Sequence, residues 1–304
     1  MSSHPALDSI RDGAAVFFDT RRACISVTGD DRLSWLNGVL TCDLADFAKS
    51  SGNHAAYGCA LNVKGRVLAD AIVVASGKRL AAFVPRTRVQ SIIDLWNGYI
   101  VMEDCEIALD ETHALVTLQG GKAVEVASAV GVASRGAKLD VLGTGEGLVF
   151  DVERAESEEI VKRLVHEGAV PLEEGDLNAL RVEAARGTHG IDFDDHNYVQ
   201  EAGLEERAVS FRKGCYVGQE VVCMLQNRGK VHKRLVKLSL ASTHGVIVGA
   251  EVKTEAAVVG TLTSLLLRDD GSALGLAMIK TSASTPGTKL EIAGNPAEVV
   301  AEAG

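Results

Sequence analysis

The pattern of apolar residues changes near residue 230, and this change limits the folds open to the chain. Before it, extended apolar runs alternate with segments whose apolar residues recur every three or four positions, as on one face of a helix. From Leu235 onward, short β-rich runs follow one another between turn signals such as Asp270-Gly271 and Pro286-Gly287. We predict an α+β body over residues 1–230 and a small β-barrel or sandwich over residues 231–304.

The pattern also indicates where the strands and helices of the body lie. Strands are expected at 56–63, 67–75, 80–84, 114–118 and 148–152. Helices are expected from Asp30, after Pro85 and through Val124. A fourth helix is expected to begin at Ser157, because a serine side chain suits the N-cap position. Beyond Leu235, no helix of useful length is expected before the terminal stretch 296–303.

Composition and charge disfavour several classes of protein. With 46% hydrophobic and 24% charged residues among 304, the chain has the profile of a globular protein and not of a disordered one. Its net charge of −10 disfavours direct binding to nucleic acid or to an anionic membrane. No apolar run reaches the roughly eighteen residues that a membrane-spanning helix needs. Because no secretory signal is visible, we expect a cytoplasmic protein, with the mitochondrial matrix as the alternative.

Common catalytic and nucleotide-binding motifs are missing. The patterns G-x-x-x-x-G-K-[ST], H-E-x-x-H and G-x-S-x-G do not occur. The cluster Gly143, Gly145 and Gly147 precedes a strand, whereas a dinucleotide-binding loop follows one, so the cluster predicts a hairpin turn. His189 and His196 lie seven positions apart in an acidic stretch and are interpreted as solvated polar residues. No metal site is predicted.

The segment 178–234 carries the residues that point to chemistry. Within it, Cys215 stands between Gly214 and Tyr216, with Lys213 two positions earlier. Flexible backbone and a neighbouring cation are features that make a thiol accessible and more acidic. A buried cysteine in a glycine turn is the competing interpretation, and the residues alone leave both open. The six cysteines form no C-x-x-C pair, so most are expected to be buried free thiols and not zinc ligands.

Several separated motifs give the chain a family resemblance. The run Lys213–Glu220 resembles the K-G-C-[FY]-x-G-Q-E signature of the YgfZ family of folate-binding proteins, which are relatives of the glycine-cleavage T-protein, an aminomethyltransferase. Residues 29–43 are similar to the family's early helix, and 118–120 to its L-Q-G turn. Residues 180–192 resemble its L-R-[IL]-E-x-G-x-x-x-x-G-x-D run, and 260–264 its G-x-[VL]-T-S run.

The resemblance implies a fold and a ligand. The fold would be of the α+β class, with two ferredoxin-like α+β parts and a C-terminal β-barrel arranged around a central pocket for tetrahydrofolate or a one-carbon derivative. Glu183 occupies the family position for binding the pterin, whose adjacent N–H groups suit a carboxylate acceptor. Either Arg228 or Lys213 would bind the anionic glutamyl tail. Tyr216 and Gln219 of the signature are assigned to the folate site.

A second region resembles a loop of the T-protein. Residues 61–70 are similar to the T-protein loop L-N-x-x-G-G-I-x-D-D, which supplies a carboxylate near the reactive folate nitrogens. Asp70 occupies the second aspartate position and Ala69 the first. Asp70 is therefore a candidate catalytic residue, together with Cys215 and Lys213.

Two functions follow from the resemblance. The leading hypothesis is a tetrahydrofolate-binding accessory protein that supports assembly or repair of iron–sulfur clusters in client proteins, with Cys215 as its functional thiol. The alternative is a folate-dependent aminomethyl or one-carbon transferase in which Asp70 steers the folate nitrogen. The expected partners are folate and iron–sulfur client proteins. Any link to tRNA modification is expected to run through iron–sulfur enzymes and not through RNA binding, because the chain is acidic.

Overall fold

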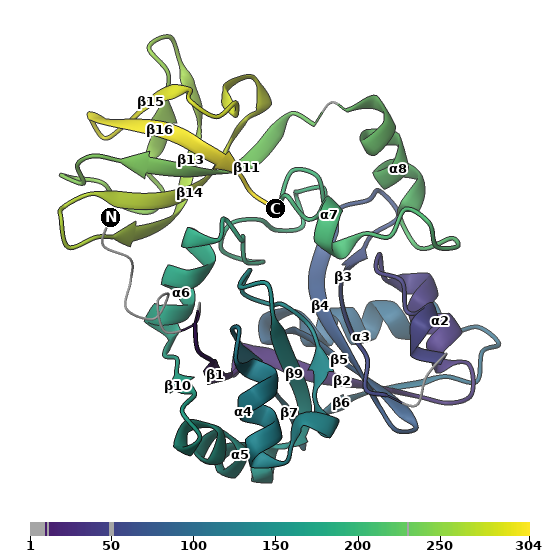
Figure 1. Cartoon of the computed structure of the whole chain (residues 1–304). Coiled ribbons are helices and arrows are strands. Elements are labelled where there is room, and N and C mark those ends of the chain that lie inside the picture. Colours follow the sequence, from purple (N-terminus) through teal and green to yellow (C-terminus); the bar gives the residue numbers. More distant parts are fainter. Residues whose placement is uncertain (1–9, 11, 49–51, 230) are drawn as a thin grey trace.

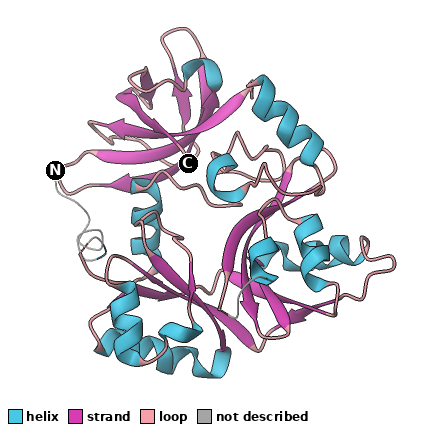
Figure 2. Cartoon of the chain, turned by 45° about the vertical axis from the view of Figure 1, so that its right-hand side comes forward, coloured by secondary structure: helices cyan, strands magenta, loops and turns pink. Residues whose placement is uncertain are grey.

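The computed structural model of the chain describes residues 10, 12–48, 52–229 and 231–304. It contains two five-stranded sheets and a closed six-stranded barrel. The three parts surround a common centre, with the barrel at the upper left of Figure 1 and the sheets below it (Figures 1 and 2). The expected α+β class with a C-terminal β-barrel is confirmed.

The first sheet is wholly antiparallel and has the order β3-β4-β5-β2-β6. Its buried side chains form a core with the flanking helices, in which Trp96 meets Trp35 edge to face at 5.9 Å between ring centroids. Its elements are β2 (Arg22–Thr28), α2 (Arg32–Val39), η1 (Ala45–Ala48), β3 (Ala55–Leu61), β4 (Val67–Ser76), β5 (Arg79–Pro85), η2 (Arg86–Arg88), α3 (Val89–Asn97) and β6 (Glu106–Asp110).

The second sheet has the order β10-β1-β7-β9-β8, in which only β1 and β10 are parallel. It packs against the first sheet through a shared apolar cluster that includes Phe83 from one sheet and Leu115 from the other. Its elements are β1 (Ala15–Phe18), β7 (His113–Gln119), α4 (Ala123–Val130), η3 (Ala133–Arg135), β8 (Ala137–Lys138), β9 (Gly147–Glu153), α5 (Arg154–His166) and β10 (Val170–Pro171).

Three helices and their loops connect the sheets to the barrel. They are α6 (Glu174–Glu183), α7 (Glu205–Ala208) and α8 (Gln219–Arg228). The barrel closes because its last strand pairs with its first, and all its pairs are antiparallel. Its elements are β11 (Lys233–Leu240), β12 (Glu251–Lys253), β13 (Val258–Leu267), β14 (Ala273–Lys280), η4 (Thr281–Ala283), β15 (Lys289–Ile292) and β16 (Asn295–Glu302). All six strands follow residue 231, although the domain boundary itself stays a prediction.

Most expected elements are present, with three corrections. Ser157 does not cap α5, because the helix begins one turn earlier at Arg154 and the Ser157 hydroxyl donates to the Arg154 carbonyl instead. The helix expected through Val124 is present as α4, but Val124 itself is exposed and Val126 lies on the buried face. The terminal stretch 296–303 is not helical, because it lies largely in β16, which closes the barrel. No helix within the described ranges is long and apolar enough to cross a membrane.

Candidate functional site

A central cavity of about 500 Å³ lies among the turn after β1, strands β3 and β4, the end of β5, helices α6 and α7, and the loop 186–191. Its lining comes from both sheets, so the cavity exists only in the assembled body. The lining residues are Asp19, Arg21, Arg22, Tyr57, Asp70, Pro85, Arg86, Thr87, Val141, Leu142, Glu174, Leu177, Arg181, Arg186, Gly187, Thr188, His189, Gly190, Ile191 and Arg207.

Like Asp19, Asp70 is a buried carboxylate of this cavity. It lies on β4 opposite Cys59 of β3, and its Oδ2 is 2.5 Å from Nη2 of Arg22. The Tyr57 hydroxyl donates to the same oxygen at 3.1 Å. Burial by itself would raise the pKa of Asp70, but the charge of Arg22 and hydrogen bonds from both partners outweigh it and lower the pKa. Asp70 is therefore ionised at neutral pH.

The cavity wall is basic although the chain is acidic. Among the described residues, six arginines line the cavity, against the three carboxylates of Asp19, Asp70 and Glu174. The Arg207 guanidinium lies over the Tyr57 ring at 4.6 Å, and its Nε is buried without a partner among the described residues. Burial and the nearby charge of Arg207 lower the pKa of Arg186. An anionic group placed between these two guanidiniums would relieve their repulsion.

His189 lies in the same wall, which corrects its interpretation as a solvated residue. It is 9% exposed, and its Nε2 has no hydrogen-bond partner within the described ranges. Its ring and that of Phe193 pack edge to face, with 5.7 Å between their centroids. His196 is solvated as expected, with 86% of its side chain exposed. The position of His189 directly before the G-x-D end of the 180–192 run was the available signal, because that run supplies a cavity loop.

The signature cysteine lies outside the cavity lining. Cys215 is the exposed cysteine, while Cys24, Cys42 and Cys59 are buried and Cys105 and Cys223 are half-buried. Burial raises the pKa of Cys24 to about 12 and that of Cys42 to about 11, so these thiols are protonated at neutral pH. Three of the six cysteines are buried, so the expectation that most are buried is met by only half of them, and Cys215 is the exposed thiol.

The ammonium group of Lys213 is hydrogen-bonded to backbone carbonyls at the end of α2. Its Nζ donates to the carbonyl oxygens of Asn37, Leu40 and Cys42 at 2.5, 2.9 and 2.6 Å. These carbonyls lie at and just beyond the C-terminal end of α2, where helical carbonyls lack partners within the helix. Lys213 thus holds the loop of Cys215 against α2.

The other signature residues also lie away from the cavity lining. Tyr216 is buried near Lys213, with 5.3 Å from the lysine Nζ to the ring centroid. The Gln219 amide donates to the Gly214 carbonyl at 3.4 Å, within its own loop. Arg228 ends α8, and its side chain is outside the described part of the structure. The structure therefore places the signature beside α2 and α8, and Asp70 in the cavity.

Glu183 faces the barrel. Its Oε1 accepts a hydrogen bond from Nη2 of Arg268 at 2.8 Å, and its carbonyl accepts one from Lys237 at 2.8 Å. It is not among the residues that line the cavity. Its pterin-binding role stays a prediction, whereas Asp70 is one of the carboxylates that line this cavity.

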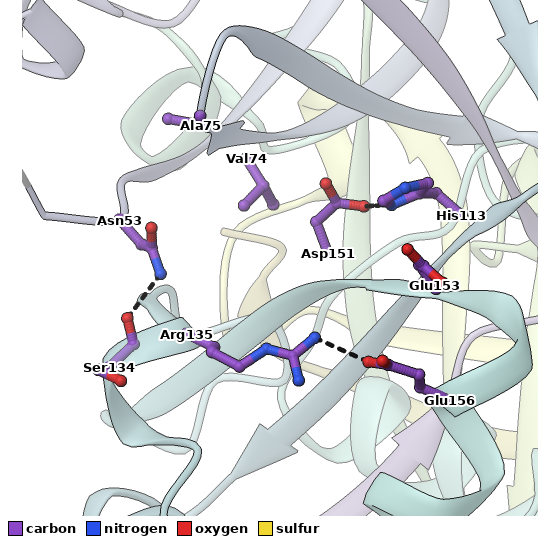
Figure 3. A pocket seen from close by; sticks show the side chains of 10 residues that line it. Asn53, Val74, Ala75, His113, Ser134, Arg135, Asp151, Glu153 and Glu156 are labelled. Carbon is purple, nitrogen blue, oxygen red and sulfur yellow. Dashed lines mark hydrogen bonds and ion pairs between the residues drawn. The ribbon is translucent and has the colours of Figure 1, made fainter.

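A second cavity, of about 400 Å³, is lined by residues that include His113, Asp151 and Glu156 (Figure 3). Its main charged groups pair with one another. The Nδ1 of His113 lies 2.8 Å from Asp151 Oδ1, and Arg135 lies 3.0 Å from Glu156. The central cavity, in contrast, contains buried nitrogens without partners among the described residues, and it is the stronger candidate for a ligand.

One exposed cluster has atoms of the kinds that bind metals. Asp194, Asp195 and His196 bring three such atoms within 4.8 Å of one another. His196 Nδ1 lies 3.4 Å from Asp194 and 3.0 Å from Asp195, so their mutual pairing accounts for the cluster.

Comparison with a solved structure shows which known fold the chain has. The fold matches the glycine cleavage system aminomethyltransferase T from Bartonella henselae, with a TM-score of 0.80 and 18% identity, covering 98% of this chain and 90% of that one. The chain therefore has the aminomethyltransferase fold.

Several known proteins are similar to this chain in sequence. A putative chloroplastic transferase of Arabidopsis thaliana is 26% identical over 98% of this chain and 72% of its own length. The tRNA-modifying protein YgfZ of Yersinia enterocolitica is 25% identical over 76% of this chain and 72% of its own. A mitochondrial iron–sulfur cluster assembly factor IBA57 homologue of Neosartorya fischeri is 26% identical over 73% of this chain and 56% of its own. Aminomethyltransferases also match in sequence. No family model matches the chain.

These relatives confirm the resemblance drawn from the motifs: the chain is similar in sequence to YgfZ and IBA57 proteins and to aminomethyltransferases.

Proposed function

We propose that this protein binds tetrahydrofolate, or a one-carbon derivative of it, and supports iron–sulfur cluster assembly or repair in client proteins. The central cavity is the observation that carries this proposal, because it combines an ionised buried carboxylate with a basic wall. The two ends of folate are complementary to these groups, because the pterin carries N–H donors and the glutamyl tail carries carboxylates.

The geometry suggests which residues serve each end. Among the described residues, both hydrogen bonds to the Asp70 carboxylate converge on Oδ2, so Oδ1 is available to accept from a pterin N–H. Arg186 and Arg207 are the cations of the cavity wall that suit a tail carboxylate. Arg186 and Arg207 are thus further candidates for the tail, beside Arg228 and Lys213 from the sequence. Lys213 is the weaker of those two, because it already donates to three carbonyls.

The iron–sulfur part of the proposal rests on Cys215 and on the relatives. Cys215 is exposed and separate from the cavity lining, so a client protein or a cluster would reach the thiol from solvent while folate occupies the cavity. A relative named as an iron–sulfur cluster assembly factor supports this assignment. We propose that any effect on tRNA is indirect and passes through such clients; salt-sensitive tRNA binding in a filter assay would contradict this view.

Calorimetry with tetrahydrofolate and its 5-formyl derivative, performed anaerobically, tests the proposal. The wild type should bind with a single site, Asp70→Asn should weaken binding at least tenfold, and Asp269→Asn, an exposed control, should not change it. Glu183→Gln tests the sequence-based assignment in the same experiment. Absence of wild-type binding would refute the folate proposal. Restoration of iron–sulfur enzyme activity by Cys215→Ser, in a strain lacking the protein, would refute the thiol's role.

Aminomethyl transfer is the second candidate, and the ionised Asp70 within the cavity favours it. Asp70 would orient or accept a proton from the reactive folate nitrogen. Folate-dependent turnover of a methylamine donor that Asp70→Asn abolishes would establish this activity. No turnover across a set of such donors, by protein shown to bind folate, would leave the accessory role.

A further inference from the structure

The central cavity contains a buried imidazole with an unused nitrogen. His189 is 9% exposed, and its Nε2 is buried without a hydrogen-bond partner among the described residues. Buried polar atoms in native proteins are nearly always satisfied, by protein groups, by water or by a ligand. Because His189 lines the cavity that contains Asp70, the missing partner of Nε2 would come from whatever occupies that cavity.

The loop that bears His189 is held rigidly. Asp192 accepts hydrogen bonds from Arg181 Nη1, the Thr188 amide and the hydroxyls of Thr263 and Ser264, at 2.5 to 2.9 Å. The Gly190 amide donates to the Phe193 carbonyl at 2.8 Å, and the Phe193 ring supports the imidazole. An imidazole positioned by this many contacts loses little freedom when a ligand binds it.

The charged groups around His189 come from three elements. Asp70 faces it from β4 and Arg88 from η2, while Asp194 and Asp195 follow it in the chain. Arg88 is paired with Asp195 at 3.2 Å, and Asp70 with Arg22, so most of these charges are compensated. Burial lowers the pKa of His189 more than the charge of Asp70 raises it, and the imidazole is neutral at pH 7.

We propose that His189 is a ligand-binding residue of the central cavity, and that its Nε2 forms a hydrogen bond with the bound folate beside Asp70. This inference rests on the proposed folate binding. The unprotonated Nε2 of the neutral imidazole accepts a hydrogen bond from an N–H group of the ligand, and protonation of Nε2 removes this acceptor. Binding is therefore expected to weaken under acid conditions that protonate the imidazole.

Calorimetric titrations with 5-formyltetrahydrofolate between about pH 5.5 and 8 test the proposal, a range that spans the ordinary histidine pKa. His189→Leu should weaken binding about tenfold to a hundredfold at pH 7.5, because a ligand group is left unpaired. His189→Gln should retain most of the affinity, and its affinity should not fall in acid as that of the wild type does. His196→Gln is the matched control, because that side chain is exposed and should leave both quantities unchanged.

A measurement on the wild type guards against misfolded variants. Nitrogen-15 NMR of the histidine side chains should show the Nε2 resonance of His189 shifting when 5-formyltetrahydrofolate is added, while that of His196 stays in place. Folate binding by the wild type, with unchanged affinity and pH profile in both His189 variants and no shift of this resonance, would overturn the inference alone. Absence of wild-type binding would overturn the proposed function as well.

Discussion

At the scale of single residues, the ion pair of Asp70 with Arg22 dominates the candidate site. Both side chains are largely buried, and 2.5 Å separates their charged atoms. Desolvation makes such a pair costly to form and more costly to break, since the remaining charge would have no close partner. Asp19 lies 3.6 Å from Arg22 and would partly compensate the charge of Arg22 if Asp70 were removed.

Replacing Asp70 by asparagine should lower the free energy of unfolding by about 3 kcal/mol at pH 7. Folding lowers the pKa of Asp70, so the stabilisation is complete above the unfolded-state pKa of about 3.9 and is lost as the pH falls toward the folded-state pKa. Urea unfolding at pH 7 and at pH 3 measures both effects. The difference between wild type and variant should shrink at pH 3, and an equal difference at both values would contradict this account.

Cys215 should react with iodoacetamide before any other thiol of the native protein. It is exposed, whereas the other five cysteines are buried or half-buried. Peptide mapping after a short exposure should place the label at residue 215, and Cys215→Ser should remove the fast phase. Early labelling of Cys59, which is fully buried, would show that the body opens under native conditions.

At the scale of elements, two short connections matter for stability. The hairpin between β15 and β16 turns through Ala293 and Gly294, both of which have positive φ, at 50° and 79°. The loop of Cys215 is held by Lys213 at the end of α2. The first connection carries backbone strain, and the second satisfies carbonyls that would otherwise lack partners.

Ala293→Asn should stabilise the protein by about 0.5–1 kcal/mol, because asparagine tolerates the left-handed conformation better than alanine and Asn-Gly is the favoured pair for this turn. Ala293 is exposed, so no packing is lost. Thermal unfolding measures the gain. A variant that is less stable than the wild type would show that the turn is not strained.

Lys213→Met should destabilise the protein by about 2 kcal/mol through the loss of charge-assisted hydrogen bonds to three carbonyls. Hydrogen exchange of residues 211–217 should accelerate, because the loop loses its attachment to α2. Lys64→Met, at an exposed lysine of another loop, is the control. Unchanged exchange would mean that other contacts, such as the Val217 amide to the Gly38 carbonyl, suffice to hold the loop.

At the scale of the whole molecule, one polar cluster joins the body to the barrel. Asp192 of the cavity loop binds Arg181 of α6 and the hydroxyls of Thr263 and Ser264 on β13. Nearby, Gly203 lies so close to Ala303 that a Cβ would stand 2.2 Å from the Ala303 carbonyl oxygen. The barrel is thus attached to the loop that lines the cavity.

Asp192→Ala should lower the free energy of unfolding by about 3–5 kcal/mol, because it leaves Arg181 buried without its partner. Since the cluster spans body and barrel, calorimetric unfolding should also become less cooperative. Asp194→Ala, at an exposed aspartate of the same loop, should leave unfolding nearly unchanged. A single sharp transition at the wild-type temperature in Asp192→Ala would refute the role of this cluster.

Local patterns predicted the elements better than the contacts between them. The apolar spacing of Ile92, Ile93 and Trp96 identified α3, because a helix must bury one face. The start of α5 at Ser157 was predicted wrongly, because the preference of serine for the N-cap position is weaker than the register set by the buried face of the helix. The helix expected at 296–303 was wrong, because this stretch pairs with β11, which is distant in sequence, and so closes the barrel as a strand.

The sequence by itself determined the change from α+β body to β-barrel, the family resemblance, and the residues with distinctive chemistry, Asp70 and Cys215 among them. Only the tertiary structure decided that Asp70 pairs with Arg22, that Lys213 binds the end of α2, that Glu183 faces the barrel and that His189 lines the cavity. The physical reason is that periodicity reports which face of an element is buried, whereas the partner of each polar group depends on how elements distant in sequence pack together.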